Sequence, residues 1–179
     1  WFNYVAVANA DETAAHVPAL GGTVLTAPFD VMEHGRMAVL QDPTGAVFGV
    51  WQARQHAGVG VRDEPGALCW NEVMTPDRAK AAAFYGKLIG WEQSSMQMPD
   101  GEYTVFMAEG TPKGGCMQIT PAMGPIPAGW VTYFAVADAA DIPRALTALH
   151  QRLVLAGRLS ARLAKTGAFL ERSAVDCAM

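Results

Sequence analysis

The chain has 179 residues and a mass of 19.1 kDa, enough for one domain or two small ones. Its hydrophobic fraction of 51% and charged fraction of 17% exclude a disordered chain. A net charge of −4 argues against a general nucleic-acid binder and a polybasic membrane binder. No apolar run approaches the ~20 residues of a membrane span. The three cysteines, Cys69, Cys116 and Cys177, form no CxxC pair, so we expect a reducing, cytoplasmic setting.

The first predicted unit covers residues 1–53. Its opening, WFNYVAVA, predicts an aromatic strand, and an Asp/Ala turn and an Ala/Leu-rich helix follow. Three strands are expected at 23–27, 36–41 and 46–52, and Asp42-Pro43-Thr44-Gly45 forms the turn between the last two. The order is therefore βαβββ. Because the chain starts at Trp1 in the middle of a strand pattern, we expect it to be a fragment.

The second unit covers residues 67–120 and repeats this order after a linker at 54–66. A strand is predicted at 68–74, then a helix capped by Thr75, with Pro76 at its first position and Gly90 at its end. Strands at 92–98, 103–108 and 116–120 complete the unit. We expect hairpin turns at Asp100-Gly101 and at 111–115.

A third unit begins after a Pro/Gly linker at 121–129, because residues 130–149 repeat residues 1–20 at an offset of 129. Trp1 matches Trp130, and Tyr4 matches Tyr133. Only the strand and helix of this unit, at 130–150, are recognisable. The remaining tail, 151–179, has five of the 13 Lys+Arg and two of the 17 Asp+Glu residues. We interpret it as an aberrant, truncated or frame-shifted end that packs loosely. A basic amphipathic helix for a partner or a membrane surface is the alternative.

Residues 35–52 (GRMAVLQDPTGAVFGVWQ), 70–77 (WNEVMTPD) and 83–91 (AFYGKLIGW) resemble the vicinal oxygen chelate superfamily, which includes glyoxalase I, bleomycin-resistance proteins and extradiol dioxygenases. The likeness covers about residues 1–149. It is greatest to actinobacterial two-domain glyoxalase-like proteins with four βαβββ units, of which this chain would keep the second, the third and the start of the fourth. The resemblance implies an α+β fold in which paired βαβββ modules form curved mixed sheets around a cavity, with helices outside.

In metal-using members of the superfamily the ligands lie on the first and last strands of each unit. The resemblance places these positions at about Phe2, Gly49, Leu68, Gln118 and Val131. Of these side chains only that of Gln118 can bind a cation, and the histidines show no HxH or HxxxH spacing. We therefore expect no metal site and no cofactor, with a rearranged metal site as the alternative.

Alternation along the expected strands selects the residues that line the cavity. The set is aromatic with a few polar groups, as in many small-molecule pockets. The expected ligand-binding residues are Phe2, Tyr4, Gly49, Trp51, Leu68, Trp70, Gln118 and Tyr133. Gly49 would leave room above the sheet. The alternative is that the aromatic side chains only fill the core.

Glu72 is the one acid on this apolar face, and it is the candidate catalytic residue. A half-buried carboxylate can shuttle a proton, but it can also pair with a cation or point to the rim. The leading hypothesis is a metal-independent protein that binds a small organic molecule. The alternatives are a glyoxalase-like lyase or isomerase with Glu72 as general base, and an incomplete fragment without activity. Unpaired modules would favour a homodimer; neither a nucleic-acid nor a membrane partner is expected.

Overall fold

The computed structural model describes residues 1–99, 101–140 and 142. The chain divides into two compact units, Trp1–Phe134 and Ala135–Met179. Of the second unit only residues 135–140 and 142 are described, and there the Ala140 N–H donates to the Asp138 carboxylate at 2.8 Å. The predicted helix of the third unit, beyond its first residues, and the tail at 151–179 lie outside the described residues. No described helix is long and apolar enough to cross a membrane.

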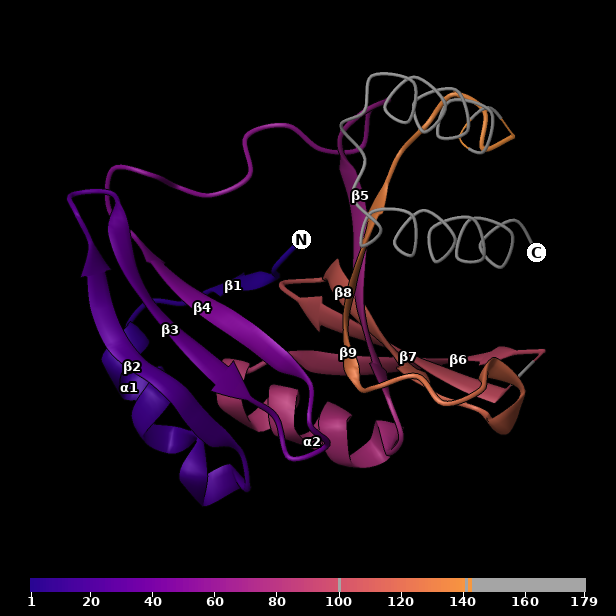
Figure 1. Ribbon diagram of the computed structural model, residues 1–179, viewed down its shortest axis with the longest axis horizontal. Helices are drawn as coiled ribbons and strands as arrows, with labels where there is room; N and C mark the ends of the chain where they lie inside the picture. The colour runs from indigo at the N-terminus through magenta and orange to yellow at the C-terminus, as the bar shows by residue number, and fades with distance from the viewer. Residues whose placement is uncertain (100, 141, 143–179) are drawn as a thin grey trace, which may run out of the picture. The chain divides into compact units, whose positions relative to one another are not determined.

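The compact unit Trp1–Phe134 contains two mixed, curved β-sheets with short helices (Figure 1). Its elements are β1 (Tyr4–Ala6), α1 (Ala10–His16), η1 (Pro18–Leu20), β2 (Thr23–Val31), β3 (Gly35–Gln41), β4 (Val47–Ala53), β5 (Leu68–Thr75), α2 (Arg78–Ile89), β6 (Glu92–Met98), β7 (Gly101–Ala108), β8 (Thr111–Gln118), η2 (Pro121–Met123) and β9 (Gly129–Phe134). This confirms the predicted α+β class. Both predicted βαβββ sequences of elements are present.

The first sheet has the strand order β1-β4-β3-β2, and only the β1–β4 pair is parallel. Helix α1 starts where the Asn9 side chain accepts hydrogen bonds from the backbone N–H groups of Asp11 and Glu12. Leu40 and Phe48, which are partners in the β3–β4 register, are fully buried in the core. In each sheet, the face turned away from the core is called its distal face below.

The second sheet has the order β6-β7-β8-β5-β9. Strand β9, the first strand of the predicted third unit, pairs antiparallel with β5. The two complete βαβββ segments therefore form separate sheets. The strand that extends the second sheet beyond β5 comes from the third unit and not from β1.

One core joins the two sheets. The ring of Tyr85 on α2 lies 5.2 Å from that of Phe48 on β4 and 5.3 Å from that of Trp130 on β9. The Tyr85 hydroxyl donates to the Asp42 carboxylate at 3.0 Å and accepts from the Trp130 indole N–H at 2.9 Å. Burial, and secondarily the Asp42 charge, raise the pKa of Tyr85 well above its usual value. The turn between β3 and β4 is thus bonded to helix α2.

The predicted start of the helix in the second βαβββ segment is wrong. Thr75 does not cap the helix but ends β5, and its hydroxyl accepts from the Asp77 N–H at 3.2 Å. The N-cap is Asp77, whose carboxylate accepts from the Lys80 N–H at 3.0 Å, so α2 starts at Arg78. The Asp77 carboxylate thus accepts a hydrogen bond from an N–H in the first turn that has no partner within the helix.

The predicted turn at 111–115 is also wrong, because β8 already starts at Thr111. The hairpin turn is Glu109-Gly110, with φ values of 52° and 71°. Two successive left-handed residues match the right-handed twist of the flanking strands. In the first sheet, β2 runs on to Val31, beyond the predicted end at residue 27, with shifts in register that accommodate the extra residues.

Candidate ligand-binding site

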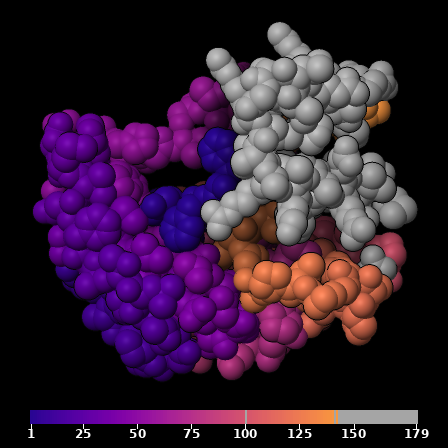
Figure 2. Space-filling model, viewed as in Figure 1, coloured from indigo at the N-terminus to yellow at the C-terminus, as the bar shows by residue number. Residues whose placement is uncertain are grey.

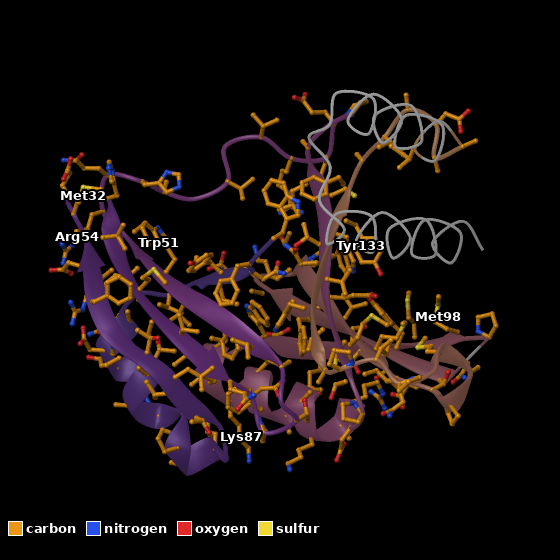
Figure 3. All side chains as sticks on the ribbon, viewed as in Figure 1. Met32, Trp51, Arg54, Lys87, Met98 and Tyr133 are labelled. Atoms are coloured by element: carbon orange, nitrogen blue, oxygen red, sulfur yellow. The ribbon has the colours of Figure 1, made fainter. Side chains whose placement is uncertain are left out.

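The distal face of the second sheet, opposite α2, carries the candidate site. Val73 on β5 is buried in the core, so the alternating neighbours Trp70 and Glu72 lie on the distal face. Across the β5–β9 pair, Trp70 is opposite Tyr133. The expected orientation of these three residues matches the observed register. Figure 3 shows Tyr133 on β9.

Glu72 is the centre of a connected hydrogen-bond cluster. The Tyr103 hydroxyl donates to its Oε2 at 2.7 Å, and the Tyr133 hydroxyl donates to its Oε1 at 2.7 Å. The Trp70 indole N–H donates to the Tyr103 hydroxyl at 2.9 Å. Glu72 is only 5% exposed. These four side chains, Trp70, Glu72, Tyr103 and Tyr133, are called the Glu72 cluster below.

Tyr103 was missed by the sequence reasoning, and a glycine on the neighbouring strand is what places it. A Cβ atom built at Gly115 would lie 1.7 Å from the Tyr103 hydroxyl oxygen. Gly115 is the partner of Glu72 in the β5–β8 register, so its bare backbone lets the phenol cross β8 to the carboxylate. In the sequence, the Gly114-Gly115 pair beside an aromatic strand was the feature that could have indicated room for the Tyr103 side chain.

The cluster holds Tyr103 in the protonated, donating form. Burial, together with the hydrogen bond to Glu72 and its negative charge, raises the pKa of Tyr103 well above 10.0. A neutral phenol donates one hydrogen bond and still accepts from the Trp70 indole. The arrangement fixes the side chains that a ligand would meet on this face.

Four other expected site residues form a separate cluster on the first sheet. The ring of Tyr4 lies 5.1 Å from that of Phe2 and 6.3 Å from that of Trp51. Gly49 does not leave open room as expected, because a Cβ atom there would lie 2.4 Å from the Tyr4 ring. Figure 2 shows the first residues of the chain, in indigo, at the surface. Phe2 and Tyr4 are 43% and 47% exposed.

Gln118 faces the opposite way from the expected one. Gly115 shares the face of Glu72, so alternation puts Cys116 and Gln118 on the α2 side of the sheet. There the Gln118 amide donates to the Pro76 carbonyl at 2.6 Å and accepts from the Arg78 N–H at 3.0 Å. The expectation failed because the register of β8 against β5 pairs Glu72 with Gly115 and Thr75 with Gln118. Gln118 fixes the entry to α2 instead of lining a cavity.

Leu68 lies at the start of β5, beyond a register shift that separates it from Trp70. It is half-buried and pairs with Phe134 on β9. Neither Leu68 nor Trp70 has a hydrogen bond to the first-sheet cluster among the described contacts. The expected site residues therefore occupy two different sheets, and only those near Glu72 form a polar constellation.

No family model matches the chain. Over 140 residues it is 41% identical to CFP32 of Mycobacterium tuberculosis, named as a candidate glyoxylase, covering 78% of this chain and 53% of the relative. Over 138 residues it is 33% identical to the anthracycline biosynthesis protein DauV of Streptomyces sp. strain C5, covering 77% and 50%. The chain thus spans about half the length of the curated relatives it matches. The 2,3-dioxygenase LapB from Pseudomonas sp. KL28 matches at a TM-score of 0.50 with 13% identity, over 84% of this chain and 59% of that one.

The chain belongs to the vicinal oxygen chelate superfamily. The predicted family is confirmed by these relatives together with the two βαβββ sequences of elements. The structure of LapB supports the fold alone. The metal that the superfamily implies is a separate question, which the donor atoms of this chain address.

The described residues do not fit the metal of the superfamily. At the implied positions, Phe2, Gly49, Leu68 and Val131 have no donor atom in their side chains. The Gln118 amide is bonded to the backbone at the start of α2. In the part of the chain that the structure describes, no three His, Cys, Asp or Glu residues gather to hold an ion. A single carboxylate, that of Glu72, falls short of the three or more ligands that such sites use.

Proposed function

We propose that this chain is a small-molecule-binding protein of the glyoxalase/bleomycin-resistance type that holds its ligand at the Glu72 cluster without a metal ion. The observation that carries the proposal is the Glu72 carboxylate, fixed by two tyrosine hydroxyls on the face opposite α2. A few fixed polar groups among aromatic side chains are typical of sites that orient an organic ligand.

The donor chemistry supports the metal-free part of the proposal. The amide that could have bound a cation, that of Gln118, is bonded on the helix side of the sheet. The remaining implied positions offer only carbon and hydrogen. A ligand would therefore be recognised by hydrogen bonds and by aromatic contact rather than by chelation.

The relatives support an organic ligand. CFP32 is named as a candidate glyoxylase and DauV as an anthracycline biosynthesis protein, and both names point to small organic molecules. This chain spans about half of each relative. A shared ligand class is accordingly part of the proposal.

A lyase or isomerase that uses Glu72 as general base is the second candidate function. It is favoured by the two tyrosine hydroxyls, each 2.7 Å from a carboxylate oxygen, because they are proton donors within transfer distance. Replacement Glu72→Gln separates the two functions. If Glu72 is a general base, the variant loses turnover completely. If the chain only binds its ligand, the variant keeps part of its affinity.

The test uses the full chain after treatment with a chelator, with bound metal measured by mass spectrometry. Three probes of matched size are titrated, namely benzylamine, benzyl alcohol and benzoate, while the Trp70 indole N–H is followed by NMR. The resonance is assigned with Trp70→Phe, and Trp51→Phe, which changes the first-sheet cluster, is the matched control.

At least one probe is expected to shift the Trp70 resonance and to raise the melting temperature, with the same affinity before and after chelation. A response that needs an added divalent ion would contradict the metal-free binding. A response at Trp51 alone, or at neither tryptophan, would contradict the proposed site.

A further inference from the structure

The Glu72 carboxylate is a buried charge with neutral partners. Among the described residues, its two hydrogen-bond donors are the phenols of Tyr103 and Tyr133. The ion pairs among the described residues involve Asp11, Asp30, Asp63 and Glu102, and none involves Glu72. A carboxylate in such a position is normally paired with a cation, because burial of an unpaired charge is costly.

The carboxylate also keeps capacity to accept. An ionised carboxyl group has about four lone-pair sites, and the two tyrosines use one on each oxygen. The acceptor positions left over are those that an N–H donor of a ligand would occupy. A charged donor would make these bonds about twice as strong as a neutral one.

The surroundings of Glu72 suit a positive charge. Tyr103, Tyr133 and Trp70 present aromatic rings, whose faces attract cations. Met96 and Met98 on β6 are 49% and 46% exposed, and Met96 is the partner of Tyr103 in the β6–β7 register. Thioether side chains adapt to the apolar part of a ligand.

We propose that the ligand of the Glu72 cluster is an organic cation, a protonated amine attached to an apolar or aromatic body. The ammonium N–H groups bond the free lone pairs of Glu72, and the rings of the cluster flank the charge. This inference rests on the proposed function and adds the charge of the ligand to it. The ligand supplies the counter-charge that the described residues do not.

The experiment compares the affinities of benzylamine, which is protonated at pH 7, of neutral benzyl alcohol and of anionic benzoate for the 179-residue chain. We expect benzylamine to bind about tenfold more tightly than benzyl alcohol, a difference of ~1.4 kcal/mol, and benzoate to bind least. In Glu72→Gln the preference for the amine should disappear while the affinity for benzyl alcohol changes less than about twofold. The control Glu102→Gln, which removes the partner of Arg78, should keep the preference.

The outcomes separate the two proposals. Equal or tighter binding of benzyl alcohol or benzoate at Trp70 would overturn the cationic ligand and leave the binding site standing. Retention of the amine preference in Glu72→Gln would also overturn it. Absence of a Trp70 response to all three probes would overturn the proposed function itself. The comparison of probes on the unmodified chain decides the charge even where the variant does not fold.

Discussion

The Thr132 hydroxyl donates a hydrogen bond to the side-chain oxygen of Asn3 at 3.1 Å, and the two residues are related by the internal repeat, whose offset is 129. Nearby, the ring of Trp1 lies 4.8 Å from that of Phe134. Residue 1 thus meets 134 and residue 3 meets 132, so the two repeated segments run in opposite directions. Equivalent residues in contact are the mark of a local twofold relationship between the repeats.

The Asn3–Thr132 contact should contribute measurably to stability. We expect the double-mutant cycle of Asn3→Ala and Thr132→Val to show a coupling of about 0.5–1 kcal/mol in urea unfolding, the value of a partly buried hydrogen bond. Strictly additive effects of the two substitutions would show that the repeats do not meet here.

Replacement Tyr85→Phe should destabilise the chain by about 1–3 kcal/mol. The substitution removes one hydroxyl but leaves both the Asp42 carboxylate and the Trp130 indole without that partner in the core. Tyr4→Phe is the matched control, because Tyr4 is 47% exposed and should change stability by less than ~0.5 kcal/mol. A Tyr85→Phe effect no larger than the control would mean that this network does not join the sheets.

Stability should fall in alkaline solution, starting near pH 9. Burial raises the pKa of Cys116 from 9.0 to about 12, and Tyr85 and Tyr103 are raised from 10.0. Above the unfolded pKa values the unfolded chain releases these protons first, so its free energy falls relative to the folded state. The stabilisation is complete below pH 9 and is lost as the pH rises through the folded values.

Replacement Cys116→Ala identifies the first step of this loss. In chemical denaturation between pH 7 and 11 the decline of the variant should begin near pH 10 instead of pH 9, because only the tyrosines remain shifted. The relevant observable is the slope against pH, since the lost side chain lowers stability at every pH. Identical slopes between pH 9 and 10 would exclude the thiol as the cause.

Replacement Gly115→Ala should disrupt the Glu72 cluster. The new Cβ would overlap the Tyr103 hydroxyl at 1.7 Å and force the phenol away from the carboxylate. Gly129→Ala on β9 is the control, because a Cβ there meets no atom within 4 Å. We expect the Trp70 indole resonance to shift and probe binding to fall at least ~10-fold in Gly115→Ala only. Unchanged binding in both variants would remove Tyr103 from the site.

Much of the fold was predictable because its signals are local. The DPTG turn and the Gly90 helix end specify backbone geometry directly, and β6 lies at 92–98 as predicted. The start of β8 was not predictable, because Glu109-Gly110 does not have the Asn-Gly or Asp-Gly pattern that usually marks such a turn. The face of Gln118 was predicted wrongly because it depends on the register of β8 against β5, which pairs Gly115 with Glu72.

The candidate site was predictable only in part for a related reason. Trp70, Glu72 and Tyr133 follow from alternation within β5 and from the repeat, which are properties of the sequence alone. Tyr103 reaches Glu72 across β8, and this depends on the register of three strands and on Gly115. Gly49 looked like open space because the sequence does not reveal that the Tyr4 ring lies over it.

The most direct test of the account is an NOE measurement on the full, chelator-treated chain with bound benzylamine. We predict NOEs from the probe to the aromatic protons of Trp70 and Tyr133, and their weakening at the same probe concentration in Glu72→Gln. NOEs to Phe2, Tyr4 or Trp51 instead, or contacts that arise only after a divalent ion is added, would contradict it.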